Sequence, residues 1–314
     1  MSMFVGFRSE DIGADTPMYY QLFENMMNKN VYSPNVERTF LLISHFFLRF
    51  LSIEWLLFLF SLVTNSLIIF RLWSLRDKGS FAIMVTVYSI IYYPQTANII
   101  RQCMAVALVF YGTKYLERGK NLKYLILVVL AFCFHRTALL GIAYYPLYYL
   151  ISNRKLEKKR KALLISIILL PIGTTFYLTR ISGTYTKYFL VSNNSFGFLY
   201  VGELCVVILF LFLGFRSIKV RENKETVIWC KRAIVSYVVG MLLSSAGYFQ
   251  TSLYRMGLYF IVFDMAYIPF VSSKGVHKRV FKVIYTLFIL FMFVNGYRSG
   301  WSGLLEYSSW LSQP

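Results

Sequence analysis

The sequence predicts an all-α, polytopic membrane protein with about ten transmembrane helices. Three observations favour this fold class: 57% of the 314 residues are hydrophobic, only 15% are charged, and the mean hydropathy is +0.56. A typical soluble domain is about 45–50% apolar and about 25% charged. The composition therefore excludes an ordinary cytosolic enzyme and a disordered chain.

The apolar residues fall into segments of roughly the length that a bilayer requires. These segments are 54–74, 80–96, 98–117, 121–135, 137–151, 162–179, 196–215, 229–249, 256–272 and 282–298. Two of them, 121–135 and 137–151, are short for a membrane span. They predict a hairpin whose tip, His135-Arg136, lies below the outer surface.

The segments predict one integral membrane domain over residues 1–314. Residues 1–38 are polar and mixed, and we expect a loop domain that forms an external N-terminal segment. Residues 39–52 are apolar but too short to span, so they predict an interfacial or re-entrant helix. The transmembrane bundle then covers 54–298, and 299–314 form an external C-terminal tail.

The net charge of +19 is explained by membrane topology rather than by a nucleic-acid partner. Most of the 33 basic residues fall in alternate loops, beginning with the loop after segment 54–74. Cytoplasmic loops of membrane proteins are enriched in Lys and Arg. The pattern therefore predicts that these loops lie inside and that both termini lie outside.

The basic residues expected outside are mainly arginines. They are Arg8, Lys29, Arg38, Arg49, Arg101, Arg136, Arg180, Lys187, Arg255 and Arg298. A planar guanidinium binds phosphate and carboxylate groups through two parallel hydrogen bonds, which an ammonium group does not. The preference for arginine indicates an anionic ligand on the outer side.

Arg101 and Arg255 are each expected at the external start of a membrane helix. The free N–H groups and the dipole of a helix N-terminus add to the positive field there. Taken singly, each is explained as a long side chain that reaches the interface. Together, and with His135 at a third external helix start, they favour an anion site, because ionisable groups at membrane depth are usually functional.

His135 and Asp15 each have two interpretations. His135 is either a structural histidine bonded to a backbone carbonyl or a general base, for which a pKa of about 6.5 is well suited. Asp15, in the sequence Gly13-Ala14-Asp15-Thr16, is either a turn or cap residue or a group that positions a sugar.

Several chemistries have no motif in this chain. There is no P-loop or glycine-rich nucleotide fingerprint, no GxSxG or HExxH motif, and no pair of external carboxylates of the glycosidase type. The four cysteines lie in apolar stretches without metal-ligand spacing. We therefore expect no cofactor and no metal site.

Four short motifs resemble the EpsG family of Wzy-like polymerases, which make bacterial exopolysaccharide and capsule. In order along the chain they are Arg8-x4-Gly13-x-Asp15-Thr16-x2-Tyr19, Asn98-x2-Arg101-Gln102-x2-Ala105, Phe134-His135-x-Thr137-Ala138-Leu139 and Tyr254-Arg255-x3-Tyr259-Phe260. Members of that family usually carry a transmembrane helix ahead of the first motif. This chain begins almost at that motif, so we expect either a truncated start or export of the N-terminus without a leading helix.

The resemblance implies a GT-C-like fold and a metal-independent glycosyltransferase of the bacterial cytoplasmic membrane. It would join polyprenyl-diphosphate-linked oligosaccharides, as donor and acceptor, on the outer face, with a chain-length regulator and a flippase as candidate partners. The catalytic residues implied are His135, Arg101 and Arg255. The substrate-binding residues implied are Arg8, Asp15, Gln102, Arg136, Tyr254 and Tyr259.

Two other functions remain open at the level of sequence. A membrane O-acyltransferase of surface polysaccharide also uses Arg and His, but its key groups should lie nearer the inner face. A flippase for lipid-linked glycans needs broken helices and polar groups through the membrane midplane. Here the midplane segments are mostly apolar, apart from Glu203 and Asp264.

Overall fold

The computed structural model of the chain describes residues 1–29, 33, 36–152, 158, 224–246, 251–274, 278–298, 304 and 309. All named elements among these residues are helices, and no strand occurs in this part of the chain. One isolated bridge pairs Arg8 with Ser309. The prediction of an all-α protein is confirmed. The predicted segments 162–179 and 196–215 lie outside the described residues.

The N-terminal segment is helical, and the prediction of a loop domain over 1–38 was wrong. It contains α1 (Ser2–Gly6) and α2 (Thr16–Lys29). In α2, Tyr19, Phe23 and Met26 recur at helical spacing and are buried, so the helix has an apolar face despite its polar composition. The next helix, α3 (Arg38–Leu48), agrees with the helix expected over 39–52.

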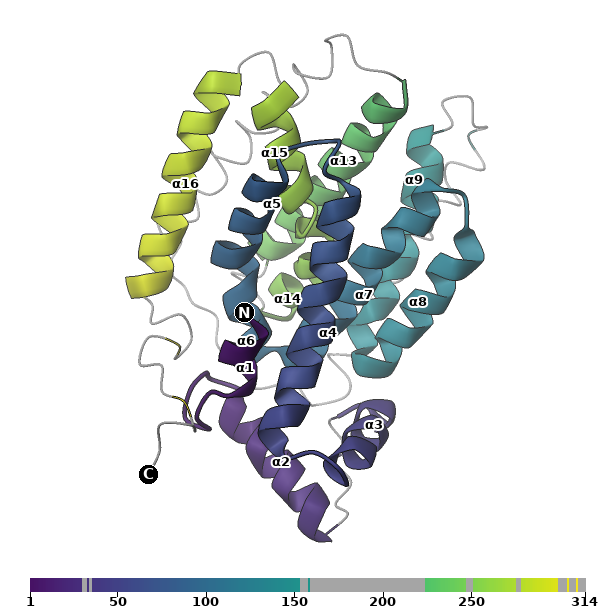
Figure 1. The fold of residues 1–314 in the computed structure, drawn as a ribbon. Coiled ribbons are helices and arrows are strands. Elements are labelled where there is room, and N and C mark those ends of the chain that lie inside the picture. Colours follow the sequence, from purple (N-terminus) through teal and green to yellow (C-terminus); the bar gives the residue numbers. More distant parts are fainter. Residues whose placement is uncertain are drawn as a thin grey trace.

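A central group of helices follows the N-terminal segment (Figure 1). Its elements are α4 (Ile53–Ser74), α5 (Phe81–Val87), the π-helical η1 (Tyr88–Tyr92), α6 (Tyr93–Asn98), α7 (Ile100–Glu117) and α8 (Asn121–Phe134). The segment expected over 80–96 is thus one helical run with a π-helical insertion. Such insertions are rare and frequently accompany functional sites.

The later elements depart further from the prediction. They are the 3₁₀ helix η2 (Arg136–Ala143), α9 (Tyr144–Ser152), α13 (Lys224–Ala246), α14 (Thr251–Ile261), α15 (Asp264–Lys274) and α16 (Lys278–Arg298). The single helix expected over 256–272 was wrong, because the chain breaks between α14 and α15. The Tyr92 hydroxyl lies 3.0 Å from the Ile261 carbonyl oxygen and 2.8 Å from Asp264 Oδ1, so η1 supplies a polar partner at the break.

Two described helices are long and apolar enough to cross a bilayer, namely α4 and residues Lys224–Ser244 of α13. The prediction of about ten spans is therefore not confirmed. Two of the predicted segments are divided into shorter helices, at η1 and at the break after α14, and two others lie outside the described residues. Helix α8, with 14 residues, is also short for a span, as its sequence predicted.

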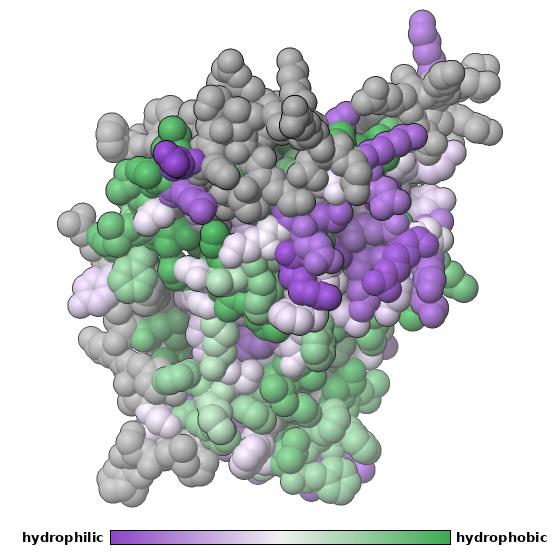
Figure 2. Space-filling model, turned by 45° about the horizontal axis from the view of Figure 1, so that its top comes forward, coloured by the Kyte–Doolittle hydropathy of each residue, from purple (hydrophilic) through white to green (hydrophobic). Residues whose placement is uncertain are grey.

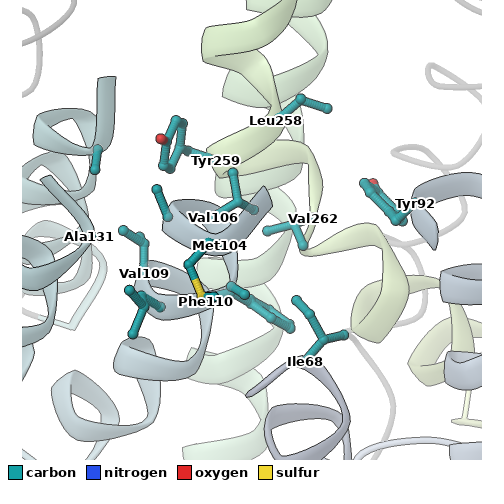
Figure 3. Close-up of a cluster of buried hydrophobic side chains, with 14 of the residues drawn as sticks. Ile68, Tyr92, Met104, Val106, Val109, Phe110, Ala131, Leu258, Tyr259 and Val262 are labelled. Atoms are coloured by element: carbon teal, nitrogen blue, oxygen red, sulfur yellow. The ribbon is translucent and has the colours of Figure 1, made fainter. Parts of the chain in front are cut away.

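The hydrophobic core is centred on α7, which packs against α4, α8 and α14. Figure 3 shows Val109 near Ala131 of α8, and Phe110 near Ile68 of α4. Small residues such as Ala105 let neighbouring helices approach α7 closely, and Ala105 is completely buried. Packing against α4, α8 and α14 therefore fixes the position of α7 and of its first turn.

The two ends of the helical group differ in charge. The connections after α4 and α7 carry Arg76, Lys78, Arg118 and Lys120 at one end. Figure 2 turns this end forward and shows hydrophilic residues gathered there, above a mainly hydrophobic lateral surface. The junctions α6–α7 and α8–η2 lie at the opposite end, because successive helices run in opposite directions.

Candidate active site

Arg101 extends from the first turn of α7 toward the N-terminal segment. Its Nε donates a hydrogen bond to the Tyr19 hydroxyl at 3.3 Å, and its Nη1 donates to Oε2 of Glu37. The third nitrogen, Nη2, makes no hydrogen bond within the described part of the chain, and it is not fully buried. The guanidinium is thus held by two hydrogen bonds and lies over the Phe40 ring, with one nitrogen that makes no hydrogen bond to a described residue.

Glu37 lies immediately before α3 and brings three segments together. Its Oε2 accepts from Arg101, while its Oε1 accepts from the backbone N–H of Arg136 at 3.1 Å and lies 3.4 Å from His135 Nδ1. Burial by itself raises the pKa of the Glu37 carboxyl. His135, Arg101 and the Arg136 N–H outweigh burial and lower this pKa to about 2, so Glu37 is a carboxylate at neutral pH.

His135 occupies the junction between α8 and η2, where the backbone is extended with φ −154° and ψ 126°. Its side chain is mostly buried, and its Nδ1 faces Glu37 at an ion-pair distance without a well-directed hydrogen bond. The ring therefore faces a carboxylate and not a backbone carbonyl. The carbonyl contact expected for a structural histidine is not seen among the described residues, and the role of His135 as a general base stays a prediction.

Arg255 lies on α14. Gln102, which follows Arg101 in the sequence, links Arg255 to the first turn of α7. Gln102 Nε2 donates to the Arg255 carbonyl oxygen at 2.5 Å, which joins the first turn of α7 to α14. The positive charges of Arg101 and Arg255 both act on the His135 ring. The three residues predicted to be catalytic thus lie around one point.

Two tyrosines of α14 have different surroundings. Tyr259 is buried, its hydroxyl lies 3.1 Å from Thr137 Oγ1, and its carbonyl accepts from the Tyr144 hydroxyl at 2.6 Å. It therefore fastens α14 to η2 and α9. Tyr254 is 41% exposed, and its hydroxyl accepts from Gln95 at 3.2 Å. Of the two, Tyr254 has the surface that a sugar ring needs for stacking.

Arg8 is completely buried, and protein atoms surround its guanidinium. Its three nitrogens donate to the carbonyl oxygens of Val5, Ile12 and Ala97 and to the Thr16 hydroxyl. The contact with Ala97, at 2.7 Å, fixes the N-terminal segment to α6. Arg8 therefore organises the segment, and direct contact with substrate stays a prediction.

Asp15 and Arg136 lie at the edge of the site. Asp15 is half-buried at the start of α2, and its charge acts on Tyr19, the hydrogen-bond partner of Arg101. Arg136 has an exposed side chain, while its backbone N–H contributes to the site. Both remain predicted substrate contacts.

Sequence reasoning missed Glu37 and the role of Tyr19. The sequence signal for Glu37 is weak, because it is one of the 14 acidic residues and lies in a segment that was expected to be a loop. Tyr19 stands at the end of the first family motif, but no contact with Arg101 was predicted for it. Among the described residues, no group of three or more His, Cys, Asp or Glu side chains is arranged to hold a metal ion.

The fold and the site define a helical protein, with two helices able to cross a bilayer and an arginine–carboxylate–histidine cluster at the end opposite its basic connections. The chain belongs to the EpsG family, whose family model matches residues 1–309. Comparison with curated proteins and with solved structures found no match. Membership of the family indicates a polysaccharide polymerase-like role, and associates the chain with glycosyltransferase-like enzymes and lipid-linked saccharide substrates.

Proposed function

We propose that this protein is a polysaccharide polymerase that joins polyprenyl-diphosphate-linked oligosaccharide repeat units. The reaction takes place on the outer face of the bacterial cytoplasmic membrane, and the donor and the acceptor are both held by membrane-embedded lipids. The observation that carries the proposal is the convergence of Arg101 from α7, Arg255 from α14 and His135 from the α8–η2 junction. Family membership supplies the coarser role, and this cluster supplies groups suited to the chemistry.

The proposed reaction is one displacement at the anomeric carbon of the donor sugar. The acceptor hydroxyl oxygen forms the new glycosidic bond, the bond between the anomeric carbon and the diphosphate oxygen breaks, and its electron pair leaves with the diphosphate. One displacement inverts the anomeric centre. Diphosphate is a good leaving group, so the reaction needs no strong general acid.

The cluster provides both functions that this displacement requires. Arg101 Nη2 and the Arg255 guanidinium stabilise the negative charge that develops on the departing diphosphate, and this stabilisation is greatest in the transition state. His135 accepts the proton of the acceptor hydroxyl. The exposed ring of Tyr254 and the half-buried Asp15 then hold the sugars beside the reacting atoms.

The outward orientation of the site follows from the distribution of charge. The basic connections after α4 and α7 lie opposite the α6–α7 and α8–η2 junctions. If the basic end faces the cytoplasm, as is usual for membrane proteins, then Arg101 and His135 face outward. Flippases and chain-length regulators are the partners expected for a polymerase in that position.

One observation favours a second candidate function, a flippase for lipid-linked glycans. The break between α14 and α15 places Asp264 at a helix start, where Tyr92 of the π-helical η1 contacts it. Broken helices with polar groups at the break are typical of membrane transporters. The site around Glu37 has no evident use in such a carrier, so we place the polymerase first.

The test is to incubate purified protein in detergent with lipid-diphosphate-linked repeat units and to measure polymer length, with and without a chelator. The proposal expects polymer growth in both reactions and release of the polyprenyl diphosphate. A requirement for metal would contradict the metal-independent mechanism. Transport of the same lipid across vesicle membranes without polymer growth would support the flippase instead.

A further inference from the structure

Both carboxylate oxygens of Glu37 have partners within the cluster. This distinguishes Glu37 from a group that keeps an oxygen for substrate. One carboxylate oxygen accepts from Arg101, and the other accepts from the Arg136 backbone N–H and faces His135 Nδ1. The Glu37 side chain is only 10% exposed. Each oxygen of this carboxylate therefore already has a partner from the cluster.

We infer that Glu37 is a positioning residue, which holds His135 with the proton on Nδ1 and leaves Nε2 unprotonated to accept the proton of the acceptor hydroxyl. The inference rests on the proposed function. A neutral imidazole carries its proton on one nitrogen, and the partner of that nitrogen fixes the tautomer. Among the described residues, the partner that the buried Nδ1 faces is a carboxylate, which accepts and does not donate.

Two other roles for Glu37 fit the geometry less well. As a general base it would need a free oxygen and a pKa near neutrality, whereas both oxygens are occupied and the pKa is lowered to about 2. As a substrate ligand it would repel an anionic diphosphate. Its position between Arg101 and His135 instead suits a group that orients both.

Glu37 also sets how much of Arg101 is available to the donor. Its Oε2 accepts a hydrogen bond from Nη1 of Arg101, and Tyr19 accepts from Nε, so Nη2 is the nitrogen of this guanidinium without a hydrogen bond to a described residue. Removal of the carboxylate frees a second nitrogen of the guanidinium. Loss of Glu37 should therefore weaken catalysis without weakening donor binding.

The kinetic test compares Glu37→Ala with wild type in the polymerisation assay, per amount of folded protein. We expect kcat to fall at least about tenfold and KM for the donor not to rise, because a mispositioned base loses part of its catalytic contribution. Glu37→Asp, which keeps the negative charge, should recover part of kcat. A raised KM with unchanged kcat, or an unchanged kcat, would overturn the inference.

A second measurement does not depend on polymerisation. The chain contains three histidines, so ¹⁵N labelling of histidine followed by NMR in detergent resolves the ring tautomers, and the His135→Ala spectrum assigns the signal. We expect His135 to carry its proton on Nδ1 in wild type and to populate both tautomers in Glu37→Ala. If Nε2 is protonated in wild type, the inference is wrong.

The two measurements separate failure of the inference from failure of the proposed function. If wild type makes no polymer, the proposed function fails, while the NMR experiment still decides whether Glu37 sets the tautomer. Glu24→Gln is a matched control, because Glu24 is an exposed carboxylate of the same N-terminal segment. It should retain wild-type kcat, KM and His135 spectrum.

Discussion

The two ends of the helical group each contain an arginine paired with a glutamate, but the pairs differ in what surrounds them. At the basic end, Arg71 of α4 and Glu117 of α7 form a two-pronged pair, with nitrogen–oxygen distances of 3.1 and 2.5 Å. At the other end, Arg101 contacts Glu37 through one nitrogen, and Glu37 also faces His135. The first pair joins two packed helices, whereas the second joins three segments.

This difference indicates which arginine is structural and which is available for chemistry. Arg71 is 1% exposed, donates a further hydrogen bond to Ser74, and lies over the Phe110 ring. Arg71 Nε also lacks a hydrogen bond to a described residue, but it is buried, whereas the unbonded Nη2 of Arg101 is not fully buried. A histidine shares the carboxylate partner of Arg101. Identical residue types thus serve stability at one end and, we propose, catalysis at the other.

The largest effect should follow from removing the catalytic groups. We expect His135→Ala, Arg101→Ala and Arg255→Ala each to reach the membrane but to lower polymerisation by about a hundredfold or more, because each removes charge stabilisation or the general base. Arg255→Lys should also be impaired, since lysine lacks the planar fork. Polymer length analysed by gel electrophoresis measures this effect.

Arg49→Ala provides the control for these variants, because Arg49 is an exposed arginine at the end of α3. It should make polymer of normal length. Normal polymer from all three catalytic variants would reject the site.

At the basic end, Glu117→Gln should lower stability and leave the turnover of folded protein unchanged. The substitution leaves the buried guanidinium of Arg71 without its carboxylate, and such losses cost about 3–5 kcal/mol. Thermal unfolding in detergent and polymerisation per folded molecule measure the two effects. Equal loss of turnover in Glu117→Gln and Arg101→Ala would remove the distinction between the ends.

The Glu37 carboxylate should make the stability of the folded protein fall at low pH. Its pKa is about 2 in the folded protein and near 4.5 when unperturbed, so the unfolded chain binds the proton first as pH falls. Stability from this group is complete above pH 4.5 and is lost toward pH 2. Between pH 5 and pH 3 the contribution of Glu37 to the free energy of unfolding should fall by about 2 kcal/mol.

Thermal unfolding of wild type and Glu37→Gln at both pH values measures this term. The variant has no titrating carboxyl at position 37, so its decline should be smaller than that of wild type. Equal declines would show that Glu37 is not a carboxylate held by its neighbours.

The smallest effects should come from two glycines with positive φ, one at each end. Gly13 has φ +95°, and an added Cβ would lie 2.8 Å from Asn98 Oδ1. Gly119 has φ +70° and no atom within 4 Å of that position. Gly119→Ala should cost about 1–2 kcal/mol of backbone strain, and Gly13→Ala should cost more because a steric clash is added.

Unfolding midpoints of the two alanine variants compare these costs directly. A larger loss in Gly119→Ala would contradict the close approach of the N-terminal segment to α6.

The candidate site was predicted from sequence where a residue type conflicts with its surroundings. Arg101 and His135 stand out because charged and polar groups at the ends of apolar segments require an explanation. Glu37 does not stand out, because a glutamate in a polar segment is ordinary. Its importance arises from the position of its carboxylate between α7 and η2, which are distant from it in sequence.

The fold, like the site, was predicted in part from the sequence. Apolar length predicted the positions of α4 and α16, because a long hydrophobic stretch has few alternatives to a helix. It did not predict the break after Ile261 or the π-helical η1, since hydropathy does not report backbone hydrogen bonding. There, the contact of Tyr92 with the Ile261 carbonyl oxygen and with Asp264 provides polar partners that the local sequence does not supply.

By itself the sequence determined the helical class, the likeness to the EpsG family and the arginines and histidine of the site, since hydrophobicity and side-chain chemistry are local properties. Only the tertiary structure decided that Glu37 lies among these residues, that Arg8 is enclosed by protein atoms, and that Gln102 joins α7 to α14. The physical reason is that hydrogen bonds and ion pairs depend on distances of a few ångströms between segments far apart in the chain, and residue order does not encode those distances locally.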